Sequence, residues 1–522
     1  MLTRREFLKL LSFAAGTSLL SPTFAKSTSN NYFALNSIIE DNPNAVFIMK
    51  TNIDEKTNSQ AIKQAALDFG KSVFQQTNDP EKGIPLTHLF PIKPNLTSWQ
   101  WDSPENFEFE DVMGAITDVN FVEGIIESMN DAGVESKQIY LRDANGPENL
   151  EYAGYGAMTE RNNIDIKLRE ENPKVVWADV PDGTYFSKLP YLWPYNAPDS
   201  WLLNIAKFKA HTMGMTLCSK NLQGTIPIPY VKHCWDWGKH LDIDEQHIQP
   251  NAFDNISDNY IRHNNNGIPR WNIESNSVVG GLGMETWVSR CIDNNRTIKP
   301  GLNVIEGIYG RDGNGFYKGP DGKGTDHMTN LIIFGKNSFY VDIIGTWLGG
   351  HEPGNFGLFH LAKEHGLIDF IDPNQIPVFD WDKNGNATES SLKDFDRYEI
   401  VTSYMGKEGE EFWHLVNEPF DYSTTSIDPN TSKKPETFIL KQNYPNPFNN
   451  ATTIEFQLKE NSKVTLEIFN SRGQLIDKLV DEFLSQGNYK RIWSNHSIPS
   501  GTYFYRIKTK SFSEMKKMVL LK

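Results

Sequence analysis

Residues 117–141 read TDVNFVEGIIESMNDAGVESKQIYL and hold the signals that indicate the class of fold. Asp118 is of a type that caps the first turn of a helix, and Gly133 is of a type that ends one. Between them an apolar stripe recurs at helical spacing, formed by Val122, Ile125, Ile126 and Met129. Residues 138–141 then read as a short buried strand. The stretch therefore predicts a helix that leads into a strand.

The same alternation continues on both sides of this stretch. Before it lie a strand-like run at 45–50, a helical run at 59–74 and a strand-like run at 89–92. After it, strands are expected at 175–178, 201–208, 302–309 and 330–334, and helices near 213–222, 277–293, 339–348 and 356–365. Strands that alternate with helices predict an α/β body with a mainly parallel sheet. We place this body at residues 26–422.

The amino-acid composition limits which classes of partner the body can bind. The 522-residue chain has a formal net charge of −15, and because residues 1–25 contribute +2 and residues 436–522 contribute +5, residues 26–435 carry −22. A body this acidic repels nucleic acid, whose phosphates are bound chiefly through Lys and Arg. The three cysteines allow at most one internal disulfide; they are Cys218, Cys234 and Cys291. Nucleic acid is therefore not expected as a partner.

The N-terminus has the features of an export signal. Arg4 and Arg5 precede a modest apolar run at residues 10–20, and the small residue Ala25 suits a cleavage site. The apolar run is shorter than the roughly 20 residues that a membrane helix needs, so no membrane segment is expected in the mature protein. The paired arginines resemble the twin-arginine (Tat) signal, which implies the Tat translocase as a partner. An ordinary secretory signal is the alternative for residues 1–25.

The C-terminal segment predicts a separate small domain. A polar linker at 423–435 is followed by short alternating stretches with turn signals between them, at 453–458, 463–470, 489–493 and 502–508. This pattern predicts a small all-β, immunoglobulin-like sandwich. Residues 436–522 resemble the type A C-terminal sorting domain of the type IX secretion system in Tyr444-Pro445-Asn446-Pro447-Phe448 and in Pro499-Ser500-Gly501-Thr502-Tyr503. The resemblance implies type IX secretion machinery as a partner, and a protein that is surface-attached or secreted.

A cluster of polar residues marks the candidate site in the body. Residues 204–212, NIAKFKAHT, leave a predicted strand and enter the helix expected at 213–222. In open α/β sheets ligands sit beyond the carboxyl ends of strands, where the next helix offers amide groups and the positive end of its dipole. Five side chains have the placement and chemistry to hold an anion: Lys207, Lys209, His211, Lys220 and Asn221.

The same residues resemble a known family. They match the signature of the family called domain of unknown function 362, namely Lys209, His211, Thr216, Lys220, Asn221 and Gly224. Further matches follow in the family's order at Lys93-Pro94-Asn95-Leu96, Thr117-Asp118, Asp143, Val304-Ile305-Glu306-Gly307 and Val341-Asp342. The resemblance covers about residues 40–365. Many members carry or adjoin ferredoxin-like clusters, but three cysteines without a Cys-x-x-Cys pair make an intrinsic iron-sulfur cluster improbable here.

The residue types suggest individual roles. His211 is the candidate acid–base group, because imidazole titrates near neutrality, and Lys209 and Lys220 are candidates for a catalytic or anion-holding role. Lys93, Asn95, Lys207, Asn221 and Asp342 are expected to bind the ligand. Each has a structural alternative: a surface lysine, a histidine that caps a helix, or a buried acid that serves only the fold. We therefore expect an exported protein that binds or transforms a small anionic ligand.

A metal site is the competing interpretation. His211, Cys218, His233 and Cys234 fall close together in the sequence, and imidazole with thiolate suits zinc or a later first-row metal. Their spacing matches no standard zinc finger or ribbon. The alternative function is accordingly a non-catalytic surface protein that binds a metal or another ligand, and whether the protein is an enzyme stays open at this point.

Overall fold

The computed structural model describes residues 32–96, 110, 113–144, 153–180, 182–211, 214–227, 247–265, 281–312, 324–400, 419–422, 437–443, 446–449, 451–460, 462–484, 487–494 and 498–521. The chain divides into a body, Met1–Asp369 with Pro373–Pro419, and a C-terminal unit, Phe370–Asp372 with Phe420–Lys522. The expected signal at 1–25 and linker at 423–435 lie outside the described residues. In the part that is described, no helix is long and apolar enough to cross a membrane.

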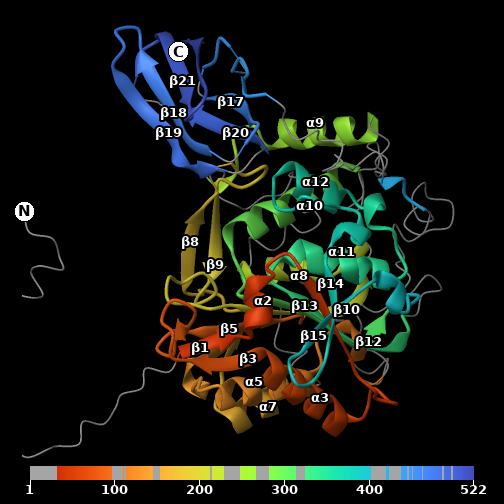
Figure 1. Cartoon of the computed structure of the whole chain (residues 1–522). Coiled ribbons are helices and arrows are strands. Elements are labelled where there is room, and N and C mark those ends of the chain that lie inside the picture. Colours follow the sequence, from red (N-terminus) through yellow and green to blue (C-terminus); the bar gives the residue numbers. More distant parts are fainter. Residues whose placement is uncertain are drawn as a thin grey trace, which may run out of the picture. The chain divides into compact units, whose positions relative to one another are not determined.

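A ten-stranded sheet is the centre of the body (Figure 1). Its order is β15-β14-β2-β13-β12-β10-β5-β6-β7, and β11 pairs with β10 outside this path. In chain order the strands are β2 (Val46–Lys50), β5 (Phe90–Pro94), β6 (Ile139–Asp143), β7 (Asp165–Leu168), β10 (Leu203–His211), β11 (Gly214–Thr216), β12 (Leu302–Arg311), β13 (Asp326–Gly335), β14 (Val378–Trp381) and β15 (Ala387–Ser390).

The sheet is mixed. A continuous parallel stretch runs from β12 through β10, β5 and β6 to β7. β13 lies antiparallel between β12 and β2, and β14 is parallel to β2. In the register, Leu203 of β10 faces Leu302 of β12 on one side and Ile92 of β5 on the other. The α/β body is therefore confirmed, with antiparallel strands at β11, β13 and β15.

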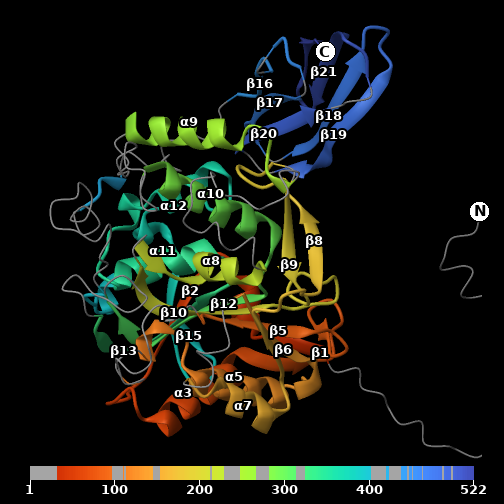
Figure 2. The same cartoon turned by 180° about the vertical axis from the view of Figure 1, so that it is seen from behind.

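Helices cover both faces of the sheet (Figures 1 and 2). One face carries α3 (Ser59–Val73), α5 (Val119–Asp131) and α7 (Tyr155–Asn162). The other carries α8 (Cys218–Asn221), α10 (Gly281–Thr297), α11 (Ser338–Leu348) and α12 (Gly357–Glu364), and α9 (Ala252–Asn265) packs on α10. The 3-10 turns are η2 (Met113–Ala115), η3 (Ser136–Gln138), η4 (Leu222–Thr225), η7 (Pro353–Asn355), η8 (Pro373–Gln375) and η9 (Leu392–Asp394).

Helix α5 shows why the stretch at 117–141 folds as it does. The Asp118 side chain accepts hydrogen bonds from the backbone of Asn120 and Phe121, as expected of an N-cap. The apolar stripe is fully buried and packs in one core with α3; it is Val122, Ile125, Ile126 and Met129. Gly133 has a φ of +93° and lets the chain turn toward β6. The predicted helix and strand are both confirmed.

Other predictions needed correction. Residues 214–216, expected at the start of a helix, form β11 instead, because Gly214 at a φ of +110° lets the chain double back onto β10. The helix α8 begins only at Cys218. The strand expected at 175–178 is β8 (Val175–Asp179), which pairs with β9 (Lys188–Leu192) away from the main sheet. A third sheet joins β1 (Tyr32–Leu35), β3 (Phe74–Thr77) and β4 (Ile84–Pro85), beside α2 (Ser37–Asp41).

The connections reverse direction between β5 and β10. From β5 the chain passes through α5 to β6, while from β10 it passes through α8 and α10 to β12 on the opposite side, and these helices lie on opposite faces. Such a topological switch opens a crevice at the carboxyl ends of the two strands, where α/β proteins bind ligands. The end of β5 carries Lys93, and the end of β10 carries Lys207, Lys209 and His211.

The C-terminal unit is made of two small antiparallel sheets, β16-β17-β20 and β19-β18-β21-β22. Its strands are β16 (Ile439–Leu440), β17 (Ala451–Leu458), β18 (Ser462–Asn470), β19 (Leu475–Leu484), β20 (Gly487–Ser494), β21 (Gly501–Lys508) and β22 (Ser513–Leu520). Inward residues of the strands, such as Ile454, Leu466 and Tyr505, form a core of their own. The all-β unit is as expected, and an immunoglobulin-like arrangement stays a prediction.

Candidate functional site

Lys93 is buried at the end of β5 and is held from three sides. Its Nζ lies 2.6 Å from Oδ2 of Asp143, at the end of β6, and donates to the carbonyl of Pro94 at 2.6 Å and to Oδ1 of Asn221 at 3.3 Å. A Cβ on Gly224 would lie 2.8 Å from this Nζ, so the glycine leaves room for the ammonium group. The signature glycine and the polar residues at the ends of β5, β6 and α8 thus form one cluster.

A chain of amides ties this cluster to the neighbouring strands. Nδ2 of Asn221 donates to the carbonyl of Lys93 at 3.0 Å and to Oδ1 of Asn204 at 2.8 Å. Nδ2 of Asn204 in turn donates to the carbonyl of Cys218 at 3.0 Å and to Oδ1 of Asn303 at 2.8 Å. β5, β10, β12 and α8 are therefore joined by side-chain amides that are all buried. Buried polar groups of this kind fix one arrangement when each is satisfied.

Two buried polar atoms, one just after β5 and one in β11, have no hydrogen-bond partner among the described residues. Asn95 donates through Nδ2 to Oδ1 of Asn221 at 3.1 Å, but its own Oδ1 accepts no hydrogen bond from this part of the chain. Oγ1 of Thr216 is likewise buried without a partner in the described structure. Both side chains are almost completely buried, with 2% and 0% exposure. Such orphan groups are rare in folded proteins.

Lys207 belongs to a second buried network. Its Nζ lies 2.6 Å from Oε2 of Glu306 and 3.3 Å from the centre of the Tyr309 ring. The backbone N–H of Asp118 donates to the same Oε2 at 3.2 Å, and the Tyr309 hydroxyl donates to Oδ2 of Asp118 at 2.7 Å. Burial raises the pKa of Glu306, and Lys207 opposes that shift. This network links β10 and β12 to the start of α5.

Lys209, Lys220 and His211 are the basic residues of the site. Nζ of Lys209 donates to the carbonyl of Ala115, in η2. Burial, and then the charges of Lys220, Arg311, Lys207 and Lys93, lower the pKa of Lys209 well below its usual value. Burial followed by Lys220 and Lys209 also lowers the pKa of His211, so its imidazole is neutral at pH 7. The sequence-predicted Lys209, Lys220 and His211 therefore lie close enough together for the lysine charges to lower the pKa of their neighbours.

A cavity of about 440 Å³ opens beside the second network. Asp118 and Tyr309 line it together with residues from the first turns of α3, α5 and α7, among them Ser59, Asn120 and Gly154. It is large enough for a small molecule. The cavity lies on the face covered by α3, α5 and α7 and shares Tyr309 with the surroundings of Lys207. Sequence reasoning did not predict it, because its walls come from four segments far apart in the chain.

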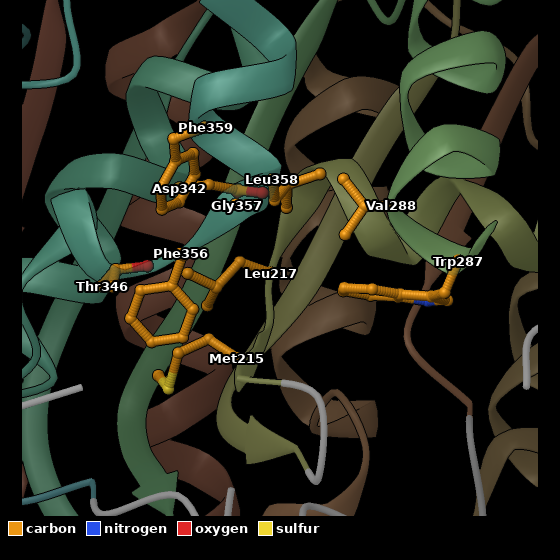
Figure 3. A pocket seen from close by; sticks show the side chains of 10 residues that line it. All are labelled: Met215, Leu217, Trp287, Val288, Asp342, Thr346, Phe356, Gly357, Leu358 and Phe359. Carbon is orange, nitrogen blue, oxygen red and sulfur yellow. The ribbon is translucent and has the colours of Figure 1, made fainter. Parts of the chain in front are cut away.

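A small, mostly apolar cavity lies among β11, α10, α11 and α12. His211 stacks on Trp287 with ring centres 6.3 Å apart. Trp287 borders a cavity of about 20 Å³, room for a single water, and Figure 3 shows it across this cavity from Met215 and Phe356. Asp342 also borders the cavity, and both of its carboxylate oxygens are used by α8. Its expected role as a ligand-binding residue stays a prediction.

The metal interpretation gains no support from the described residues. Within them, no group of three or more His, Cys, Asp or Glu residues could hold a metal ion. Burial and Asp342 raise the pKa of the Cys218 thiol well above its usual range, which disfavours the thiolate that a metal needs. Among the described residues, Cys218 and Cys291 form no disulfide. His233 and Cys234 lie outside the described residues, so that part of the metal prediction stays a prediction.

The site contains residues that sequence reasoning had not singled out as partners. Arg311 lies 2.7 Å from Oδ1 of Asp326, and Lys56 lies 2.8 Å from the other oxygen of the same carboxylate. One sequence signal could have indicated such buried ion pairs: a charged residue inside an apolar strand, as with Glu306 among Val304, Ile305 and Ile308. A charge in such a run must be paired, because an isolated charge is too costly to bury.

Comparison with known proteins identifies both parts of the chain. Residues 91–347 match the family described as "Domain of unknown function (DUF362)", and residues 442–521 match the "Secretion system C-terminal sorting domain". Among curated proteins there is no match.

Solved structures match only in small part. Latent dimeric PorU from Porphyromonas gingivalis is 22% identical over 16% of this chain and 9% of its own, with a TM-score of 0.14. PorZ of the same organism, a surface component of the type IX secretion system, is 14% identical over 18% and 13%, with a TM-score of 0.13. The chain thus spans about a tenth of the length of these solved proteins. The two family matches, by contrast, cover the central part of the body, residues 91–347, and most of the C-terminal unit, residues 442–521. The protein therefore carries a DUF362 domain followed by a type IX C-terminal sorting domain, and it is exported to the cell surface or secreted.

Proposed function

We propose that the body binds a small anion at the carboxyl ends of β5 and β10, with Lys209 and Lys220 holding the negative charge and His211 beside them. The carrying observation is the gathering of buried cations around Lys209, namely Lys220, Arg311, Lys207 and Lys93, whose charges add to burial in lowering its pKa. Three of these cations face carboxylates within 2.7 Å, since Lys93 faces Asp143, Lys207 faces Glu306 and Arg311 faces Asp326. Nζ of Lys209 donates to the backbone carbonyl of Ala115 in η2.

Burying a cluster of cations is costly unless something offsets the repulsion. In a body with a net charge of −22, positive charge collected at a topological switch is an arrangement that favours an anionic ligand. A bound anion would favour the protonated forms of Lys209 and His211. Binding should therefore take up protons, and affinity should rise as pH falls.

The proton-handling role of His211 follows from its neutral state. An imidazole whose pKa lies well below its usual value is unprotonated at pH 7 and can accept a proton when an anion arrives. This property serves a binding protein and an enzyme alike. Binding is the function that the site supports best, and a chemical step on the ligand would be an addition to it.

The test is the affinity for simple anions, measured by calorimetry on the purified full-length chain. Phosphate, sulfate, malate and succinate provide the panel. We expect Lys209→Met to reduce affinity tenfold or more while the melting temperature stays equal or rises, because the substitution removes a buried charge that its neighbours repel. Lys137→Met is the matched control, since that side chain is 72% exposed and should leave affinity unchanged.

Proton uptake provides a second readout. In buffers of different ionisation enthalpy, the binding heat should show protons taken up by the protein, and Lys209→Met should lessen this uptake. A Lys209→Met protein that binds as tightly as the original would overturn the proposal. So would a large loss of stability in that variant, since it would mean that Lys209 serves the fold.

A further inference from the structure

The two orphan atoms carry more information about the ligand. Oδ1 of Asn95 can only accept a hydrogen bond, and it accepts none from the described residues. Oγ1 of Thr216 can donate and accept, and within the same residues it does neither. Each lies in a side chain that is at least nine-tenths buried. Leaving such groups unpaired is costly, so a folded protein keeps them where a ligand or water completes them.

The orientation of the Asn95 amide is fixed by its surroundings. Oδ1 of Asn221 must face Asn95, because Nδ2 of Asn221 is committed to the carbonyl of Lys93 and to Asn204. Asn95 therefore has to present its NH₂ group to that oxygen, at 3.1 Å. Reversing the amide would bring two oxygens together. The free atom of Asn95 is thus an acceptor.

Both orphan atoms adjoin the proposed anion site. Thr216 is the register partner of Lys209 across the β10–β11 pair, so the two side chains stand on the same face. Asn95 contacts Asn221, the residue that follows Lys220 in α8. Asn95 is also tied to the segment between η2 and α5, because its N–H donates to the Thr117 hydroxyl at 2.9 Å. The lysines and the two orphan atoms therefore come from adjoining positions.

We propose that the anion bound at this site carries a hydrogen-bond donor close to its negative charge, which Asn95 accepts, while the Thr216 hydroxyl donates to the anion. This inference rests on the function proposed above and names its ligand class. A hydroxycarboxylate and a hydrogen phosphate share this chemistry, because each places an O–H beside anionic oxygens. Succinate and sulfate lack the donor.

The expected selectivity follows from the cost of an unpaired acceptor. A site built to pair with a ligand hydroxyl discriminates strongly against the analogue that lacks it, because the buried partner is then left unsatisfied. We expect malate to bind at least about tenfold more tightly than succinate, or hydrogen phosphate at least about tenfold more tightly than sulfate. Within each pair the two anions are alike in size, so the donor is the main difference.

Competition calorimetry on the full-length chain at pH 7 separates the outcomes. Preference for malate identifies a hydroxycarboxylate ligand, and preference for hydrogen phosphate identifies a phosphate ligand. Equal affinities within both pairs overturn this inference and leave the proposed anion binding intact, with water as the partner of Asn95. If none of the four anions binds, anion binding fails as a whole.

Two variants test the residues themselves. Asn95→Leu should abolish the preference within the discriminating pair, and Asn251→Leu, at an exposed asparagine, should leave it unchanged. Thr216→Val keeps the shape of the side chain and removes only the hydroxyl. It should therefore lower the affinity for both anions of the pair by the same factor. The wild-type comparison needs no variant, so misfolding of Asn95→Leu would not remove the test. Retained preference in a folded Asn95→Leu protein would contradict the assignment.

Discussion

Asp342 is a buried carboxylate whose oxygens organise the start of α8. Its Oδ1 accepts from the N–H of Cys218 at 2.7 Å, and its Oδ2 accepts from the N–H of Ser219 at 2.8 Å and from the Ser219 hydroxyl at 2.5 Å. Burial outweighs these bonds and raises the pKa of Asp342 to about 7. These bonds tie Asp342 to the start of α8, the helix that also carries Lys220 and Asn221.

The raised pKa makes stability depend on pH. The folded state holds a proton on Asp342 up to about pH 7, whereas the unfolded chain releases it near the ordinary value of 3.8. Between these values the folded state binds more protons at Asp342, so its contribution to the free energy of unfolding should fall as pH rises and level off above about 7. For one proton, the fall is at most about 1.4 kcal/mol for each step of one in pH. Urea denaturation across this range measures the slope.

Asp342→Asn checks the source of that slope. The amide does not titrate, so the dependence on pH should become shallower between pH 4 and 7, although the variant is less stable because its NH₂ faces backbone donors. Asp131→Asn is the control, because this carboxylate is 58% exposed. An unchanged slope in Asp342→Asn would show that another group titrates.

Membership of the candidate site could be predicted for residues whose type suits ligand binding and whose position is at the end of a predicted strand. Lys209, His211 and Lys220 could be grouped because they bracket one strand end within a short stretch of chain. The ion pairs of Lys93 and Lys207 could not be predicted, because their partners lie about fifty and about a hundred positions away, and only the sheet order brings them together. The orphan state of Asn95 likewise depends on the three-dimensional network around Asn221.

At the scale of elements, the start of α5 contacts β12 and borders the cavity of about 440 Å³. Asp118 caps the helix through Asn120 at 2.7 Å and also accepts the Tyr309 hydroxyl from β12. Removing the carboxylate takes away the cap and leaves a buried hydroxyl without its acceptor. The start of α3 has a simpler cap, in which exposed Asn58 accepts from the N–H of Ala61.

Asp118→Ala should therefore lower the free energy of unfolding by more than the loss of an ordinary helix cap does. We expect about 2–4 kcal/mol, from about 1 kcal/mol for the cap and about 1–3 kcal/mol for the unpaired Tyr309 hydroxyl. Asn58→Ala should cost about 1 kcal/mol. In the double variant Asp118→Ala with Tyr309→Phe, the loss measured by urea denaturation should be smaller than the sum of the single losses, because the two side chains share one bond. Equal costs for Asp118→Ala and Asn58→Ala would contradict this account.

Elements with strong periodicity were predictable, and short ones were not. The stripe of α5 identified the helix, and the apolar run of β12 identified a central strand. The sequence signals weakened after residue 369, yet β14 and β15 extend the main sheet there with four residues each. So short a strand carries too few alternations to be recognised. β14 is placed by its parallel pairing with β2, in which Val378 faces Val46.

At the scale of the whole molecule, the body and the C-terminal unit each have a hydrophobic core of their own. Their cores share no residue among those described, since the body core includes Ile125 and Val304 while the C-terminal core includes Phe456 and Ile507. Their charges also differ, with −22 on residues 26–435 and +5 on residues 436–522. The proposed site draws only on the body.

Deleting residues 436–522 should therefore separate folding and binding from export. Because the body core is complete without the sorting domain, the truncated protein should keep its melting temperature and its anion affinity, measured as for the full chain. Because the sorting domain directs the last step, secretion out of the cell, the truncated protein should remain in the periplasm, as cell fractionation would show. Fusing residues 436–522 to an unrelated periplasmic reporter is the matched control and should direct that reporter out of the cell. Normal secretion of the truncated protein would mean that the body holds an export signal of its own, and loss of its anion affinity would mean that the site depends on the C-terminal unit.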